Sequence, residues 1–409
     1  MSASQQVIIV GAGHAGGSAA ALLRQHGWKG GITLIGAEPQ LPYQRPPLSK
    51  TWLKGEETGE ALQLRSARFY KDNGITVHLS TAVDGIDRKA RTAATSRGEK
   101  LSYDYLILAT GSRNRPLPVR GAQLNGVLEL RSAADADCLQ AALQPGTKLA
   151  VVGGGFIGLE VAASARALGA EATVIEREER LLPRVVCAEL SSYFAQRHHE
   201  AGVELMLGAT VVGVEGCAGR VVAIMLADGR RLPCDVALVG IGAVADDRLA
   251  QAAGLACDNG VAVDLEARSS DDRIFAIGDC SRRPLPFYNA EFRLESVPNA
   301  LEQANQAARA ICSKPAPAPE VPWFWSDQYD IRLQIAGLPF GSVRIAIRGS
   351  PDSGKFAVFH QAEDDRIVAV EAVNMPQAMA IGKLLIAKGK AVSSEQLADE
   401  AFPLKDLAR

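Results

Sequence analysis

The amino-acid sequence predicts an α/β protein with two Rossmann-like dinucleotide-binding domains, the second inserted in the first, and a C-terminal α+β domain. The apolar segments 7–10 and 149–152 each run directly into a G-x-G-x-x-G motif that a helical pattern follows. After the proline-rich stretch 314–322 the pattern changes to consecutive short strands. One glycine motif of this kind is weak evidence, but two in the same context favour a protein that holds two dinucleotides.

The three glycines of each motif have separate roles: a tight turn, close approach of the backbone to a diphosphate, and close packing of the helix on the strand. The diphosphate then lies at the free N–H groups and positive end of that helix. Contacts with the two dinucleotides are therefore expected at Gly11, Gly13, His14, Ala15 and Gly16 in the first motif, and at Gly153, Gly155, Phe156, Ile157 and Gly158 in the second.

An acidic residue follows each motif at the distance typical of ribose recognition. Glu38 lies 22 residues beyond Gly16, and Glu176 lies 18 residues beyond Gly158. A carboxylate there accepts hydrogen bonds from the ribose hydroxyls and repels a 2′-phosphate, which favours NADH over NADPH at the second motif. Arg177, directly after Glu176, could instead pair with that phosphate. The alternative for either glutamate is a solvated residue at a strand end.

The order of predicted elements divides the chain into three domains. Strands and helices alternate from residue 7 to about 110, and a second unit runs from about 112 to 240, with a helix at 133–143. The strand 273–277 and the helix 298–311 then resume the first unit. The expected domains are 1–111 with 244–320, 112–243, and 321–409. In the last domain we expect strands at 331–336, 343–347, 356–359 and 367–373, and helices at 377–387 and 394–399.

The composition is that of an ordinary globular protein, with 47% hydrophobic and 22% charged residues. A formal net charge of −2 gives no indication of nucleic-acid binding. The longest apolar stretches are strand-sized, so we expect no transmembrane span and no signal peptide. Seven cysteines without C-x-x-C spacing favour a reducing compartment, which we expect to be the cytoplasm, and argue against disulfides and a metal site.

Several motifs beyond the glycine loops carry a resemblance to a known family. They are LPYQRPPLSK at 41–50, ATG at 109–111, IGD at 277–279, ESVPNA at 295–300 and WFWSDQ at 323–328. With these motifs the chain resembles the putidaredoxin-reductase-like flavoproteins, which are FAD-dependent NADH–ferredoxin reductases. The resemblance extends from residue 7 to residue 404. It is specific, because the segments 41–50, 295–300 and 323–328 are not general dinucleotide-binding features.

The resemblance implies a glutathione-reductase-like architecture in which 1–111 with 244–320 binds FAD and 112–243 binds NADH. Relatives often have an acid at the position of Ala37, whereas this chain has Glu38 next to it. The family's FAD contacts match Ala15, Lys50, Val83, Arg131, Asp279 and Val297. Neighbouring candidates in the same segments are Glu38, Arg45, Ala109, Thr110, Gly111 and Gly278.

Hydride transfer requires the nicotinamide to stack on the flavin with water excluded. We hypothesise that Lys50 and Glu160 form an ion pair beside the flavin that holds the ring and the carboxamide. Phe156 is either an aromatic lid over the nicotinamide position or an ordinary packing residue. The resemblance places Trp325 beside the flavin and facing the electron acceptor, with a core role in the small domain as the alternative. Lys50, Glu160 and Trp325 are thus the candidate catalytic residues.

The segment 38–55, where glutathione-reductase-type enzymes carry C-x-x-x-x-C, contains no cysteine. We therefore expect electrons to leave from the flavin itself, toward a [2Fe–2S] ferredoxin of a heme-thiolate monooxygenase or ring-hydroxylating dioxygenase system. The alternatives are an NADH oxidase, a rubredoxin or monodehydroascorbate reductase, and a redox-sensing interaction flavoprotein. We expect a monomer or weak dimer. Because such ferredoxins are usually acidic, candidate docking cations are Arg65, Arg68, Arg293, Arg309, Arg332 and Lys383.

Overall fold

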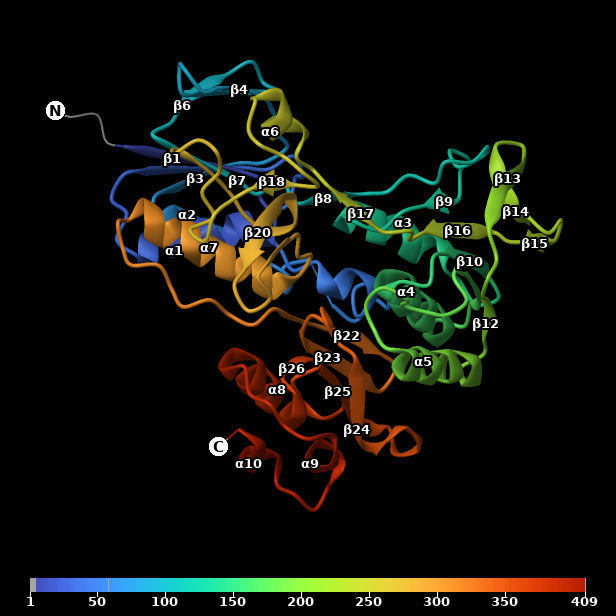
Figure 1. The fold of residues 1–409 in the computed structure, drawn as a ribbon. Helices are drawn as coiled ribbons and strands as arrows, with labels where there is room; N and C mark the ends of the chain where they lie inside the picture. Colours follow the sequence, from blue (N-terminus) through green and yellow to red (C-terminus); the bar gives the residue numbers. More distant parts are fainter. Residues whose placement is uncertain (1–4, 58, 409) are drawn as a thin grey trace.

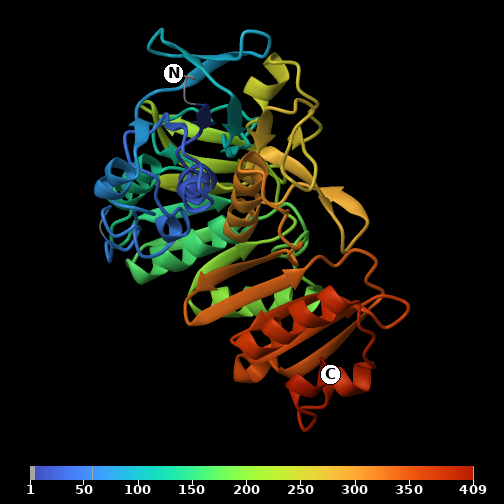
Figure 2. The same ribbon diagram turned by 90° about the vertical axis from the view of Figure 1, so that its left-hand side faces the viewer.

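The computed structural model describes residues 5–57 and 59–408, which form three domains around a common junction (Figure 1). Two parallel-sheet domains lie side by side, and the C-terminal domain lies beneath them. Figure 2, turned by 90°, shows the same C-terminal domain, in red and orange, projecting below the other two. No helix among the described residues has both the length and the apolar character needed to cross a bilayer.

The first domain is built on a five-stranded parallel sheet with the strand order β19-β7-β1-β2-β3. Successive side chains along these strands point into two different hydrophobic cores, one on each face of the sheet, because both faces of a parallel sheet are covered. Helices α1 and α7 pack against one face, and α6 with a small antiparallel sheet covers the other. The bounds are β1 Gln6–Val10, β2 Gly31–Ile35, β3 Ile75–His78, β7 Tyr105–Leu108, β19 Ile274–Ala276, α1 His14–Gln25, α2 Ala67–Asp72, α6 Arg248–Ala252 and α7 Val297–Ile311.

The second domain repeats this design with the strand order β12-β11-β10-β16-β9. Its chain is inserted in the first domain, since β19 joins β7 only after the second sheet is complete. Strands β8 (Ser112–Asn114) and β17 (Ala243–Ala245) pair where the chain enters and leaves the second domain. The other bounds are β9 Val127–Leu128, α3 Ala133–Ala142, β10 Lys148–Val152, α4 Phe156–Ala167, β11 Glu171–Ile175, α5 Ala188–Glu200, β12 Val203–Met206 and β16 Val236–Val239.

Beside each parallel sheet lies a three-stranded antiparallel sheet, in the place where another crossover helix could lie. The expected simple alternation of strands and helices up to residue 110 is therefore wrong over residues 83–102, which form β4, β5 and β6. Short segments with turn residues between them can pair locally, and the pairs cover the sheet face as a helix would. The bounds are β4 Val83–Asp87, β5 Thr92–Thr95, β6 Lys100–Ser102, β13 Val211–Cys217, β14 Arg220–Leu226 and β15 Arg231–Pro233.

The C-terminal domain is a five-stranded antiparallel sheet in the order β22-β23-β26-β25-β24. One face carries the C-terminal helices, and the other packs Leu333, Phe356 and Val358 against Tyr193 and Phe194 of the second domain. The motif at 323–328 is the edge strand β22, and α10 was not predicted. The bounds are β22 Trp323–Gln328, β23 Ile331–Gly337, β24 Arg344–Ser350, β25 Lys355–Gln361, β26 Ile367–Val373, α8 Pro376–Lys388, α9 Ser394–Ala398 and α10 Leu404–Leu407.

Short elements complete the connections between these layers. The 3-10 turn η1 (Pro46–Ser49) lies in the loop after β2, and η2 (Gly278–Cys280) follows β19. A small sheet of β18 (Val261–Ala262), β20 (Ser281–Leu285) and β21 (Ala290–Phe292) leads into α7. A last turn, η3 (Pro351–Ser353), joins β24 to β25. Both η1 and η2 thus lie where the first sheet's carboxyl edge meets the other domains.

Candidate cofactor sites and their junction

Both glycine loops have the same backbone geometry. Gly11 and Gly153 have φ of +112° and +110°, and a Cβ at either would lie 2.1 Å from the Ala109 carbonyl oxygen or 2.5 Å from that of Gly240. Only glycine fits a left-handed conformation against a neighbouring backbone in this way. Each loop therefore turns tightly between a strand and a helix, as both motifs predict.

The middle glycine of each loop faces open space. A Cβ at Gly13 would meet no atom within 4 Å, and one at Gly155 would meet only the Gly240 carbonyl oxygen at 4.0 Å. Each glycine is the N-cap of the following helix, and neither end carries a side-chain cap. A helix N-terminus that is open and lacks a cap is a place where a diphosphate fits. The residues present therefore fit a dinucleotide at each loop.

The first helix start adds two observations that suit a bound cofactor. The Nδ1 atom of His14 is buried and finds no hydrogen-bond partner among the described residues. Burial, followed by the charge of Arg45, lowers the pKa of His14, so that its imidazole is neutral. Gly278 also lies here, since its Cβ would be 3.1 Å from that of Ala15 and 3.8 Å from that of Ala300. The first turns of α1 and α7 therefore meet at η2.

Glu38 is held by two side chains of the loop after β2. Tyr43 Oη donates to one carboxylate oxygen at 2.6 Å, and Arg45 pairs with the other. Ala37, where relatives often have the acid, is exposed, whereas Glu38 is partly buried. The same tyrosine accepts a hydrogen bond from the backbone N of Ala133, which ties this loop to the second domain. Tyr43 was not predicted, although it lies within the motif at 41–50.

Asp279 lies at the carboxyl end of β19 within a second polar cluster. Its Oδ2 accepts hydrogen bonds from Ser112 Oγ at 2.9 Å and from Arg131 Nη2 at 3.1 Å. Arg45 also donates to the Arg131 carbonyl oxygen, so that the clusters around Glu38 and Asp279 are linked. The sequence predicted Arg131 and Asp279 as neighbours of one cofactor, and the structure brings them together; Ser112 was not predicted.

The other residues expected along the first site lie at the same edge of the sheet. Ala109, Thr110 and Gly111 follow β7, and Thr110 Oγ1 donates to the Asp246 carbonyl oxygen at 2.6 Å. Val297 is the first residue of α7, whose N-terminus is capped by Ser296. Val83 begins β4 beyond Thr81, whose backbone N donates to the Gly36 carbonyl oxygen.

At the second loop the acidic residue contacts the loop itself. Glu176 Oε2 accepts a hydrogen bond from the backbone N of Gly154 at 2.7 Å, and Oε1 accepts one from the N of Glu178 at 3.0 Å. Arg177 is 73% exposed and pairs with Glu178. Ile157, on the first turn of α4, is 44% exposed. Gly153 and Gly154 are buried, so the exposed group at this helix start is the Ile157 side chain and not the loop backbone.

The predicted ion pair between Lys50 and Glu160 is present, with 2.6 Å between Nζ and Oε2. It is largely buried, with 17% and 7% of the two side chains exposed. Ser49 Oγ donates to the same oxygen at 2.5 Å, and Ser326 Oγ of β22 donates to Oε1 at 2.7 Å. Glu160 therefore binds groups of the first and C-terminal domains while its own helix begins at the second glycine loop. Neither serine was predicted, although both lie in motifs that the sequence singled out.

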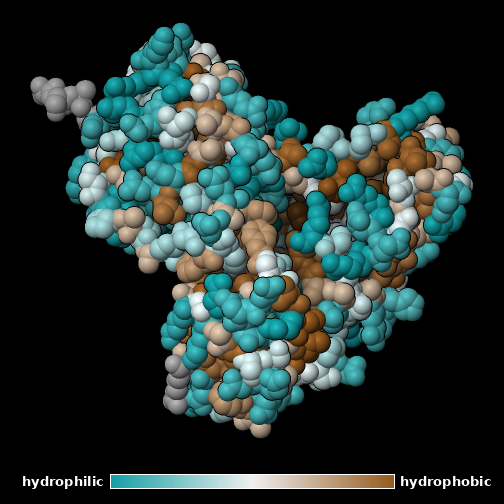
Figure 3. Space-filling model, in the orientation of Figure 1, coloured by the Kyte–Doolittle hydropathy of each residue, from teal (hydrophilic) through white to brown (hydrophobic). Residues whose placement is uncertain are grey.

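Aromatic side chains of β22 lie on both faces of that strand: Phe324 on the face of Ser326, toward Phe156, and Trp323 with Trp325 on the other. The ring of Phe156 lies edge-on to that of Phe324, with 4.8 Å between centroids. The ring of Trp325 lies 5.7 Å from that of Trp323, over which Lys383 Nζ lies at 5.3 Å. Figure 3 shows a hollow where the three domains meet, with apolar residues in its walls.

The candidate docking cations do not form one cluster. Arg68 and Arg332 have exposed side chains, 88% and 63%, on the first and C-terminal domains. Arg65 lies over the ring of Phe69, and Arg309 bonds to the linker carbonyl oxygen of Pro315. Arg293 is only 10% exposed and pairs with Glu295, which leaves little of its guanidinium to a partner. Lys383 alone among the six has a described contact with the tryptophan pair.

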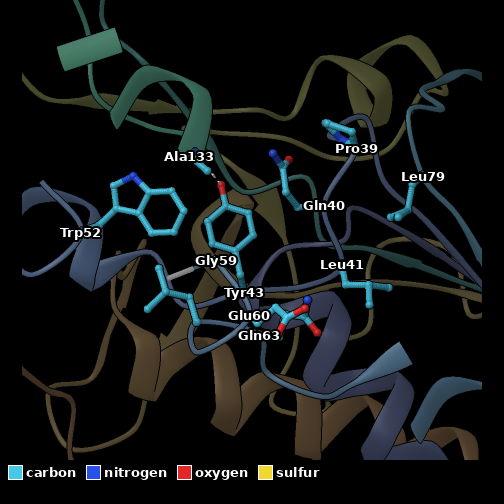
Figure 4. A pocket seen from close by; sticks show the side chains of 11 residues that line it. Pro39, Gln40, Leu41, Tyr43, Trp52, Gly59, Glu60, Gln63, Leu79 and Ala133 are labelled. Carbon is cyan, nitrogen blue, oxygen red and sulfur yellow. Dashed lines mark hydrogen bonds between the residues drawn. The ribbon is translucent and has the colours of Figure 1, made fainter. Parts of the chain in front are cut away.

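A cavity of about 670 Å³ lies beside the first site, behind Tyr43. In Figure 4 the ring of Tyr43 lies between Trp52 and the side chains of Pro39, Gln40 and Leu79, and its hydroxyl reaches Ala133. None of the lining residues belongs to a glycine loop.

The chain matches known proteins over almost its whole length. Residues 5–304 match the family described as pyridine nucleotide-disulphide oxidoreductase, and residues 323–408 match the reductase C-terminal domain. A "probable ferredoxin reductase CtmF" of Castellaniella defragrans is 48% identical over all of both chains. "Putidaredoxin reductase CamA" of Pseudomonas putida is 41% identical, over 100% of this chain and 97% of the relative. The solved structure of a covalent putidaredoxin reductase–putidaredoxin complex has a TM-score of 0.96 at 41% identity, over 99% of this chain and 98% of the other.

Proposed function

This chain belongs to the pyridine nucleotide-disulphide oxidoreductase family, and from that premise we propose that it is an NADH-dependent FAD flavoprotein that reduces a [2Fe–2S] ferredoxin. The downstream enzyme would be a heme-thiolate monooxygenase or a ring-hydroxylating dioxygenase. The observation that carries the proposal is the junction at Glu160, where the helix of the second glycine loop meets Lys50 of the first domain and Ser326 of the third.

We assign FAD to the first loop and NADH to the second. The diphosphate of FAD would lie at Gly13, with Asp279 and Arg131 toward its flavin end and Glu38 toward its ribose end. The contacts of Glu38 with Tyr43 and Arg45 support a FAD site whose wall is formed before the cofactor binds. NADH would lie at Gly155, with Glu176 accepting hydrogen bonds from its ribose hydroxyls. When bound, these two cofactors supply hydride transfer, while the protein supplies position and electrostatics.

Lys50 and Glu160 act as positioning residues in this proposal. A buried ammonium held by a carboxylate and by the Pro46 carbonyl oxygen, at 2.9 Å, has little freedom to move. It would therefore present a fixed positive charge beside the flavin. Glu160 lies one turn beyond Phe156, on the side from which the nicotinamide would enter, and the ring of Phe156 would help to keep water out of that position.

The proposed electron acceptor follows from two features, the segment 38–55 and the tryptophans of β22. The segment 38–55 supplies Lys50 and contains no cysteine, so no dithiol can pass electrons on from there. Trp325 and Trp323 lie together on the edge strand β22, and Lys383 adds a positive charge that suits an acidic protein. We place the protein in the cytoplasm as a monomer or weak dimer, in keeping with its seven free cysteines.

The test is to mix the purified flavoprotein with NADH and a panel of [2Fe–2S] ferredoxins, following ferredoxin bleaching and peroxide formation together. Fast bleaching with little peroxide is expected. Peroxide or water without ferredoxin reduction across the panel would instead identify an NADH oxidase. Slow turnover with every acceptor, together with an NADH-induced dimer in solution scattering, would identify a redox-sensing flavoprotein. Preference for rubredoxin or for monodehydroascorbate, added to the same panel, would identify the remaining alternatives.

A further inference from the structure

A cysteine, a histidine and a glutamate lie together between the second domain and the C-terminal sheet, away from the sites described above. Cys187 is the N-cap of α5, His360 is in β25 and Glu371 is in β26. A sulfur, an imidazole nitrogen and a carboxylate oxygen of these residues all lie within 4.8 Å of one another. His360 and Glu371 are 5% and 1% exposed, and Cys187 is partly buried.

The imidazole of His360 is oriented by a hydroxyl group. Its Nδ1 lies 3.3 Å from Ser342 Oγ, and its Nε2 lies 3.1 Å from Glu371 Oε1. Yet the buried Nε2 makes no hydrogen bond of acceptable geometry within the described residues. A histidine that binds a metal commonly has its other ring nitrogen hydrogen-bonded, which fixes the nitrogen that faces the ion. If Nδ1–H donates to Ser342, the Nε2 lone pair faces the Glu371 carboxylate, an arrangement that a cation between the two would satisfy.

We propose that Cys187, His360 and Glu371 bind one divalent transition-metal ion of the Zn²⁺ type, with water as the fourth ligand. Thiolate, imidazole and carboxylate are the three ligand types that Zn²⁺ takes in proteins, at bond lengths that separate the ligands of a tetrahedral site by about 3.3–3.8 Å. The observed spacing reaches these values with small side-chain adjustments. The proposal is independent of the electron acceptor.

Metal binding at this site releases a proton. The species that binds a metal is the thiolate, so the thiol of Cys187 has to lose its proton when the ion binds. Binding forms the metal–sulfur bond, and the thiol proton passes to solvent. The other charged groups near the thiol are Glu189 in α5 and Arg180, whose Nη1 lies 3.3 Å from the Cys187 carbonyl oxygen.

The ion would strengthen an existing connection between two domains. Both carboxylate oxygens of Glu371 already accept the backbone N–H of Cys187, at 3.1 and 3.2 Å, so Glu371 caps α5 from across the interface. The segment before Cys187 reaches the second glycine loop, where the Leu182 N donates to the Gly154 carbonyl oxygen at 3.1 Å. A bound metal would therefore fix the segment 182–187 to the C-terminal sheet.

The test is calorimetric titration of the chelator-treated flavoprotein with Zn²⁺ alone, in two buffers with different ionisation enthalpies. Cys187→Ser removes the thiolate and keeps a good helix cap, and His360→Gln removes the imidazole. Cys217→Ser makes the same change at an exposed cysteine and is the matched control. The unmodified protein and the control should bind one Zn²⁺ per chain. The Zn²⁺ concentration at half-saturation should be at least tenfold higher in Cys187→Ser and in His360→Gln. Zinc should raise the unfolding temperature of the unmodified protein and of the control, but not of these two variants.

Unchanged binding by Cys187→Ser would overturn the proposal, and this variant decides the matter even if His360→Gln fails to fold. Loss of binding in Cys217→Ser would show an exposed thiol to be the ligand. Absence of zinc uptake by the unmodified protein would likewise overturn the proposal.

Discussion

The two glycine loops share one backbone geometry and differ in their surroundings. Around the first loop, polar side chains pair with one another: Glu38 with Arg45 of the same loop, and Asp279 with Arg131, 148 residues away in the chain. Around the second, Glu176 bonds to the backbone of its own loop, and Ile157 is exposed. The two loops thus share a backbone and differ in whether distant side chains or the loop's own backbone bind the acidic residue beside them.

This difference matches the two roles that we propose. A cofactor that stays bound gains from a wall of interlocked side chains, because the ordering of these groups is complete before binding. A nucleotide that must leave after each turnover is better served by a site with few long-range contacts to break, as around Glu176. We therefore expect damage to the first loop to remove the flavin, and damage to the second to change only the use of NADH.

The largest effects are expected from Gly13→Val and Gly155→Val. Both glycines have ordinary negative φ, −84° and −83°, and a Cβ at either has room, so both variants should fold. The added side chain occupies the space proposed for the diphosphate. Gly13→Val should lose its flavin and all NADH oxidation, whereas Gly155→Val should stay yellow with a KM for NADH raised about 100-fold, or about 3 kcal/mol. A yellow Gly13→Val protein, checked for folding by circular dichroism, would contradict the assignment.

The second prediction concerns the ion pair that connects the two loops. Lys50→Met or Glu160→Gln alone leaves a buried group without its partner, which should destabilise the protein by about 3–5 kcal/mol. The double variant removes both charges and should recover at least half of that loss in urea unfolding. Each single variant should also slow reduction of the flavin by NADH. Reduction at the wild-type rate in both would show that the pair has no role in positioning.

Next in size is a pH effect at the junction of the second and C-terminal domains. His198 of α5 is fully buried between Gln328 Oε1 and Tyr329 Oη, and burial lowers its pKa to about 4. Since the unfolded chain takes up a proton near its ordinary pKa of 6.5, stability should be complete above pH 6.5 and fall as the pH drops toward 4. The loss should reach about 3 kcal/mol at most.

Comparing the pH dependence of unfolding in the wild type and in His198→Gln separates the contribution of this histidine from that of other side chains between the domains. Tyr288 joins the first domain to the C-terminal domain by donating to the Val368 carbonyl oxygen, and burial raises its pKa to about 12, so that it does not titrate in this range. Thermal unfolding at pH 7 and pH 4.5 should show a smaller difference in His198→Gln than in the wild type. An equal difference would place the acid sensitivity elsewhere.

The smallest effect is expected on cofactor choice. The wild type should use NADH far better than NADPH, and Glu176→Ala should narrow this preference about tenfold, or about 1.4 kcal/mol, because the carboxylate no longer repels a 2′-phosphate. The control is Glu38→Ala, the same change beside the other loop, which should leave the preference unaltered in kcat/KM measurements. Equal use of both nucleotides by the wild type would refute the role of Glu176.

Features encoded locally could be predicted from the sequence. The two strand–glycine–helix turns agree with expectation because the spacing of each motif encodes them. The insertion of one domain in the other and the ion pair between Lys50 and Glu160, 110 residues apart, also agree, but they were inferred from the order of elements and from motif resemblance. The antiparallel sheets at 83–102 and 211–233 were not predicted, since pairing between short strands depends on the surface beneath them.

Contacts between distant segments account for most of what sequence reasoning missed. The bond from Ser326 to Glu160 joins positions 166 residues apart, and no periodicity signals it. Cys187 and Glu371 meet across 184 residues only through domain packing, which no ligand spacing in the sequence records. Tertiary packing, which no short motif records, places these groups together.

One measurement tests the central claim, electron flow from NADH through the flavin to a ferredoxin, most directly. The oxidised flavoprotein is mixed without oxygen with one equivalent of NADH, and a [2Fe–2S] ferredoxin is then added while flavin and ferredoxin absorbance are followed together. The account predicts that NADH bleaches the flavin and that its absorbance returns as two ferredoxins are reduced for each NADH. A flavin that NADH reduces but that no ferredoxin in the panel reoxidises would contradict it.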